Sequence, residues 1–157
     1  MSVEAKLMEL GIQLPPPPPA VAAYEPWMRT GNLILTSGQL PWKNGELAFS
    51  GKCGAEITED QGYQAASQCA INAISQLKAA AGDLDRVRQI VKVDGYVHTA
   101  PGFRGHPQVL NGASELIRSV FGERGRHARL AVGIDEMPLN AAVQICVIAE
   151  IEDYPIS

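Results

Sequence analysis

The sequence has no long hydrophobic run. Nowhere in its 157 residues do about 20 apolar residues follow one another, and the N-terminus lacks a basic stretch followed by an unbroken apolar one. We therefore expect no membrane span and no secretory signal, and predict a cytoplasmic protein. Positive charge is also scarce: 17 acidic residues against 13 basic ones give a net charge of -4, which does not favour nucleic acid as a partner.

Cysteine and histidine are too few and too scattered to form a site by spacing. Cys53, Cys69 and Cys146 are odd in number and far apart, with no C-x-x-C pair, and no histidine stands at a zinc-like distance from them. A disulfide scaffold and a metal site are therefore not expected. A phosphate loop is also missing, because in "GELAFSGK" the second glycine comes one place late and cysteine follows the lysine. Ser37 lies outside any G-x-S-x-G motif.

What remains is the pattern of one globular domain with an N-terminal extension. Apolar residues make up 46% of the chain, and a domain of this size buries about 68–70% of its unfolded surface. Ser2 can cap a short helix that Gly11 ends, and the five prolines at 15–19 then impose an extended segment. That segment is either a disordered linker or a stiff strap against the surface, and we favour the strap. We assign residues 1–19 to this helix and strap and residues 20–157 to the main domain.

The main domain reads as an α+β fold. "TEDQ" at 58–61 has the spacing of a capping box and opens a helix that Gly82 ends, while a second apolar stripe repeats at three and four residues up to Phe121. Alternating or β-branched segments predict strands at 23–29, 32–37, 88–98, 126–134 and 142–151, with Thr30 and Gly31 in the first turn. This order predicts a mixed β-sheet with two helices packed on one face.

A sheet covered on one side leaves its other face bare in a monomer. To the bare face we assign an apolar row of the last strand, formed by Val143, Ile145, Val147, Ala149 and Ile151. A cyclic oligomer that covers the sheet is the simplest way to bury such a face.

The segment "RHARLAVGIDEMPLN" at 126–140 contains the clearest candidate functional residue. Alternate positions from Ala128 to Ile134 are apolar, whereas the other face carries Arg129 followed by Ala131 and Gly133, which are too small to fill the space beside it. The arginine either pairs with a buried acid or binds a ligand. No acid occurs on that face before Asp135. A guanidinium in open space can hold a carboxylate through two parallel hydrogen bonds.

Three segments together resemble the Rid/YjgF family, the reactive intermediate deaminases also called L-PSP endoribonucleases. They are "GNLILTSGQLP", "LNGASEL" and, above all, "ARLAVGIDEMPLNAAV", and the resemblance covers about residues 20–151. "ELGIQLPPPPPA" and "FGERGRHARLAVG" are similar to a longer branch of the family. The resemblance implies a chorismate-mutase-like fold, a homotrimer, and three clefts between subunits.

The resemblance also implies an activity: hydrolysis of 2-imino acids to 2-keto acids and ammonia, with no cofactor. Arg129 matches the arginine that holds the substrate carboxylate; Tyr24, Ser37 and Asn111 match residues at the cleft; and Ala131 falls where a backbone group contacts substrate or water. The expected ligand is a small carboxylate metabolite.

One position departs from the family pattern. The deaminases carry a V-E-I-E segment in the last strand whose first glutamate helps to hold the attacking water, and here the segment reads "VQIC", with Gln144 at that position. A glutamine donates and accepts hydrogen bonds but is no carboxylate base. With Arg129 and Gln144 as catalytic candidates, two functions stay open: an imine deaminase of weak or altered specificity, and a non-catalytic keto-acid-binding protein. An endoribonuclease is a weaker third, because neither a histidine pair nor a lysine-rich groove is visible.

Overall fold

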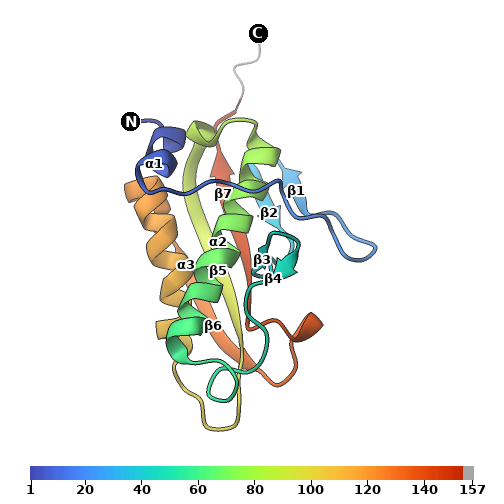
Figure 1. Ribbon diagram of the computed structural model, residues 1–157. Helices are drawn as coiled ribbons and strands as arrows, with labels where there is room; N and C mark the ends of the chain where they lie inside the picture. The colour runs from blue at the N-terminus through green and yellow to red at the C-terminus, as the bar shows by residue number, and fades with distance from the viewer. Residues whose placement is uncertain (154–157) are drawn as a thin grey trace.

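The computed structural model describes residues 1–153, and its centre is a five-stranded mixed sheet (Figure 1). The strand order is β1-β2-β7-β5-β6. β5 and β6 are parallel and the other neighbouring pairs are antiparallel, which confirms the predicted mixed sheet. The strands are β1 (Trp27–Thr30), β2 (Leu33–Thr36), β5 (Val87–His98), β6 (Ala128–Ile134) and β7 (Val143–Ile151).

Two long helices, α2 (Glu59–Ala81) and α3 (His106–Phe121), pack side by side on one face of this sheet (Figure 1). α2 begins as predicted: the Thr58 side chain accepts from the Gln61 backbone N–H, and the Gln61 side chain accepts from the Thr58 backbone N–H. Gly82 ends it with a φ of 80°, a conformation that suits glycine. The α+β fold class is confirmed.

The bare face of the sheet is real, but its residues differ from those we predicted. Val143 and the other four members of the apolar row lie under the helices and are at most 1% exposed. Alternation defines two faces of a strand without saying which one is covered, so the row was assigned to the wrong face. The open face instead presents apolar side chains that are 36–61% exposed, namely Met28, Leu33, Leu35, Leu130 and Val132.

The N-terminal segment lies against α2. After α1 (Val3–Glu9), which Ser2 caps, the chain crosses in front of α2 (Figure 1). The Ser75 hydroxyl donates to the Pro15 carbonyl at 2.5 Å, and Gln76 Nε2 donates to the Pro18 carbonyl at 2.7 Å. These two carbonyls are three residues apart, which is one turn of a polyproline helix.

We did not predict one small hairpin. β3 (Trp42–Lys43) pairs with β4 (Glu46–Leu47) through a turn at Asn44 and Gly45, both with positive φ. Asn-Gly is the strongest short-range hairpin signal, so this hairpin was predictable. β1 begins four residues later than expected, at Trp27, and ends one residue later, at Thr30. Short 3-10 turns complete the structure at Leu84–Arg86, Gly122–Gly125 and Pro138–Asn140. Within residues 1–153, no helix has the length and apolarity to span a bilayer.

Candidate functional site

Arg129 is a half-buried cation without an acidic partner. Its Nη1 donates to Asn111 Oδ1 at 2.9 Å and to Ser114 Oγ at 3.3 Å, and both of these residues lie on α3. Across the described part of the chain, Arg129 makes no ion pair. Neutral groups therefore orient one nitrogen of the guanidinium and leave its charge uncompensated, as a carboxylate-binding site requires.

His127 supports this arrangement from the same face of the strand. Its Nδ1 lies 2.7 Å from the Gly125 carbonyl, and its Nε2 lies 2.8 Å from Ser114 Oγ. Because a carbonyl only accepts, Nδ1 carries the proton, so in the neutral ring Nε2 accepts from the Ser114 hydroxyl. Ser114 and His127 were not predicted as site residues from the sequence. The signal for His127 was its position two residues before Arg129, on the same side of the strand.

The small residues beside Arg129 lie under α3 at the edge of the sheet. Ala131 is partly buried against the core and pairs with Gly95, over which the Leu110 side chain packs. Gly133 faces the imidazole of His106. β6 is an outer strand of the sheet, so one of its two edges is open in a single chain.

A second group of predicted residues lies away from β6, around the end of β2 and the central strand β7. Tyr24 is 45% exposed, and its hydroxyl accepts from the Val21 backbone N–H at 3.4 Å. The Ser37 hydroxyl donates to the Glu25 carbonyl at 2.5 Å. The Gln144 side chain lies over Gly38, where a Cβ would come within 1.9 Å of Gln144 Nε2.

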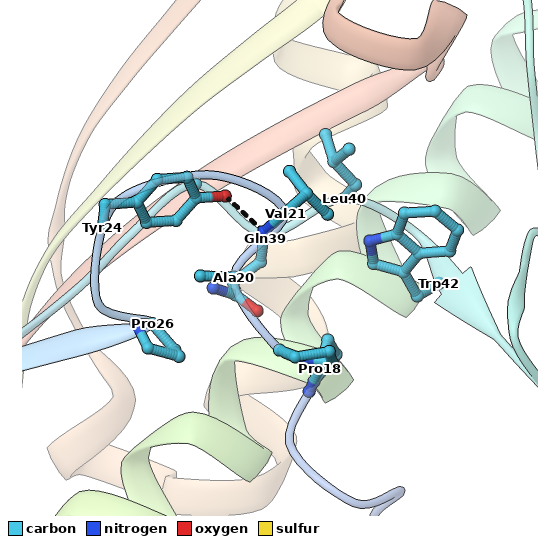
Figure 2. Close-up of a pocket in the computed structure, with 10 residues that line it drawn as sticks. Pro18, Ala20, Val21, Tyr24, Pro26, Gln39, Leu40 and Trp42 are labelled. Atoms are coloured by element: carbon cyan, nitrogen blue, oxygen red, sulfur yellow. Dashed lines mark hydrogen bonds between the residues drawn. The ribbon is translucent and has the colours of Figure 1, made fainter.

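Figure 2 shows a hollow beside this second group, enclosed by Tyr24, Pro26, Gln39, Leu40 and the end of the proline segment. Its volume is about 30 Å³. That space suits a single water molecule, so the hollow cannot hold a metabolite by itself.

The two groups do not meet within one chain. Ser37 follows β2, and Arg129 lies on β6 beyond β7 and β5, so three strand spacings of about 4.8 Å, roughly 14 Å, separate the two strands. Gln144 stands in register with Tyr96 on the open face, whereas Arg129 stands in register with Val93, which is buried under the helices. Arg129, Asn111 and Ala131 thus lie in one group, and Tyr24, Ser37 and Gln144 lie in another.

The thiols do not add a nucleophile to either group of residues. Burial raises the pKa of Cys53 to about 11, with a smaller contribution from the charge of Glu59, and burial also raises the pKa of Cys69 well above its usual value. Cys146 lies in β7 beside Asp94, and its pKa is also raised, mainly by burial. Protonated thiols are poor nucleophiles at neutral pH. In residues 1–153, no three side chains of His, Cys, Asp or Glu gather to hold a metal ion.

Comparison with known proteins places the whole chain in one family. The family model described as "YjgF/chorismate mutase-like, putative endoribonuclease" matches residues 4–151. Protein TCP17 of Trypanosoma cruzi is 42% identical over 152 residues, which are 96% of this chain and 95% of that protein.

Two solved structures share the fold closely. Atu1372 of Agrobacterium tumefaciens, a protein of unknown function, is 44% identical with a TM-score of 0.89, and the match covers 96% of this chain and 92% of that one. A protein from Shewanella oneidensis with the same endoribonuclease description is 38% identical with a TM-score of 0.94, over 96% and 100% of the two chains. The chain therefore belongs to the YjgF/Rid family.

Proposed function

We propose that the protein binds small 2-imino and 2-keto acids in a cleft built by two copies of the chain, and that it hydrolyses the imino acids slowly. The observation that carries this proposal is the guanidinium of Arg129, which is oriented by Asn111 and Ser114 but has no counter-charge. A ligand carboxylate supplies that charge and fits the planar donor geometry.

The two halves of the cleft lie on different strands and on opposite faces of the sheet, so we propose that a neighbouring copy completes it. We propose a homotrimer in which the β6 edge of one copy meets the Tyr24 and Ser37 segment of the next. A closed ring repeats this one contact three times, and it also covers the apolar open face around Leu35 and Leu130. Obligate interfaces are rich in apolar surface of this kind.

In this reaction the main task of the protein is to position the imino acid and the water. Water attacks C2 of the protonated imine, the resulting tetrahedral carbinolamine expels ammonia, and the 2-keto acid remains. The iminium carbon is already electrophilic, so holding the carboxylate on Arg129 and a water beside C2 supplies most of the catalysis. In this arrangement the Gln144 amide orients the water but cannot take its proton, which is why we propose slow turnover.

The main alternative is a binding protein without turnover, which the amide at Gln144 also favours. The two functions share a cleft and a ligand, and they differ only in chemistry.

Two measurements test the proposal together. Calorimetric titration with pyruvate and 2-oxobutanoate tests binding, and release of ammonia from freshly generated 2-iminopropanoate tests turnover against the rate in buffer. We expect binding together with slow hydrolysis. Binding without any acceleration would favour the alternative, and absence of binding to every 2-keto acid would overturn both.

A further inference from the structure

The guanidinium of Arg129 uses only one of its nitrogens inside the chain. Nη1 donates to Asn111 Oδ1 at 2.9 Å and to Ser114 Oγ at 3.3 Å, and within residues 1–153 these are the only hydrogen bonds of the side chain. An arginine carries five N–H groups, of which two are on Nη1, two on Nη2 and one on Nε. Both hydrogens of Nη1 are therefore engaged. The free donors lie on Nε and Nη2, which together form one edge of the planar group.

Ser114 makes a different hydrogen bond from the other serine near the end of α3. The Ser119 hydroxyl donates to the Glu115 carbonyl four residues before it at 2.9 Å, as helical serines often do. The Ser114 hydroxyl lies instead 2.8 Å from His127 Nε2, whose lone pair accepts the hydroxyl proton. Because this proton points to His127, the lone pairs of the Ser114 oxygen are left for Nη1 of Arg129.

His127 is in turn fixed by the backbone that leads into β6. Its Nδ1 lies 2.7 Å from the Gly125 carbonyl. Gly125 is buried against α3, where a Cβ would come within 2.7 Å of the Ile117 backbone oxygen, so this backbone approaches the helix more closely than another residue would allow. The position of the imidazole relative to Ser114 is thus set by backbone. A continuous series of hydrogen bonds runs from the Gly125 carbonyl through His127 and Ser114 to Arg129.

We propose that His127 and Ser114 are positioning residues, which hold Nη1 so that the Nε–Nη2 edge of Arg129 receives the ligand carboxylate. This inference rests on the proposed function, which supplies the carboxylate. A carboxylate takes two parallel N–H bonds from one edge of a guanidinium, and only this edge has both donors free. A long side chain loses rotamer freedom when a ligand fixes it, and an arginine that is already held loses less on binding.

The proposal is tested by removing and restoring each hydrogen-bonding group. His127→Leu removes the acceptor of the Ser114 proton, whereas His127→Gln replaces it with an amide oxygen. Ser114→Ala removes the hydroxyl, whereas Ser114→Thr keeps it. In calorimetric titration with pyruvate, His127→Leu and Ser114→Ala should each bind about tenfold more weakly than the native protein, and His127→Gln and Ser114→Thr should stay within about threefold of it. Ser119→Ala is the matched control on the same helix and should bind like the native protein.

The double variant His127→Leu/Ser114→Ala separates positioning from a general structural effect. If His127 acts through Ser114, the double variant should bind within about twofold of Ser114→Ala alone, whereas a disturbed fold would add a second loss. The Ser114 pair keeps the test intact should His127→Leu fail to fold. Native-like affinity in Ser114→Ala, no recovery in Ser114→Thr, or additive losses in the double variant would overturn the inference and leave the proposed function standing. Absence of pyruvate binding by the native protein would overturn both.

Discussion

Arg129 is the residue whose substitution should most reduce ligand affinity. Arg129→Ala should weaken pyruvate binding by about 2–5 kcal/mol, the loss expected when one partner of a desolvated charge pair is truncated. Arg129→Lys should recover only part of the lost affinity, because a lysine cannot make the two-point contact. Calorimetric titration measures both. Arg126→Ala is the matched control, since Arg126 is exposed and pairs with Glu123. Equal affinity in Arg129→Ala and native protein would rule out the clamp.

Substitution of Gln144 should change the rate of turnover without changing ligand affinity. Gln144→Glu keeps the length of the side chain and its place over Gly38, and it restores a carboxylate beside the water. If general-base assistance has its usual value, hydrolysis of 2-iminopropanoate should rise by about 10²–10⁴, with pyruvate affinity unchanged within a few fold. An ammonia-release assay on both proteins provides the test. Fast hydrolysis by the native protein, with no gain in the variant, would show that Gln144 is not the limiting group.

Ionisation of the Cys53 thiol should lower the free energy of unfolding at alkaline pH. Its pKa rises from an ordinary 9.0 to about 11 in the fold, so the folded protein holds the thiol proton more tightly than the unfolded chain does. The stabilisation is complete below pH 9 and is lost as the pH rises toward 11. Denaturant titrations of native protein and Cys53→Ala across this range should show a steeper decline in the native protein. Parallel declines would contradict the raised pKa.

The sequence located Arg129, and the family resemblance pointed to Asn111, but Ser114 and His127 were not predicted. Alternation along 128–134 set the arginine apart from its apolar neighbours, and that prediction needs only a strand. Ser114 and His127 became visible only in the fold, because their contact depends on where α3 crosses β6. The roles of Tyr24, Ser37 and Asn111 came from family resemblance, and those roles remain predictions.

At the scale of elements, the packing of the proline segment against α2 should depend on Gln76. This side chain is 1% exposed, and its Nε2 donates to both the Pro18 carbonyl and Gln39 Oε1. Gln76→Ala leaves these acceptors unpaired and should reduce the free energy of unfolding by about 1–3 kcal/mol while speeding proteolysis within residues 11–20. The exposed Gln64 on the same helix gives the control Gln64→Ala, with a change below about 0.5 kcal/mol. Indistinguishable variants would contradict the anchoring role.

The helices were predicted more accurately than the strands. A capping box at Thr58 and a terminal glycine at Gly82 are local signals, and local signals suffice to bound a helix. The covered face of β7 depends instead on which side of the sheet the helices pack, and the alternation of apolar residues does not determine that side. The β3–β4 hairpin was not predicted, although its Asn-Gly turn is a clear signal in the sequence.

At the scale of the whole molecule, the sequence predicted an open sheet face, and the structure confirms it with different residues. The proposed cleft cannot form within one chain, because the strands that carry its two halves are about 14 Å apart and Arg129 and Gln144 lie on opposite faces of the sheet. We therefore propose that a neighbouring copy joins the two halves. The central claim is thus that Arg129 and Tyr24 act from different copies on one ligand.

Hybrid trimers test this claim most directly. Arg129→Ala disables one half of the cleft, and Tyr24→Asp disables the other by placing a like charge beside the carboxylate, so neither variant alone should bind pyruvate. When the two variants are mixed, unfolded and refolded together, random assembly should restore about a quarter of the clefts, each with Arg129 from one copy and Tyr24 from the next. Calorimetric titration of the mixture counts these sites. Recovery near that fraction is the predicted result, and a mixture that binds no pyruvate although sedimentation shows hybrid trimers would contradict a cleft shared between copies.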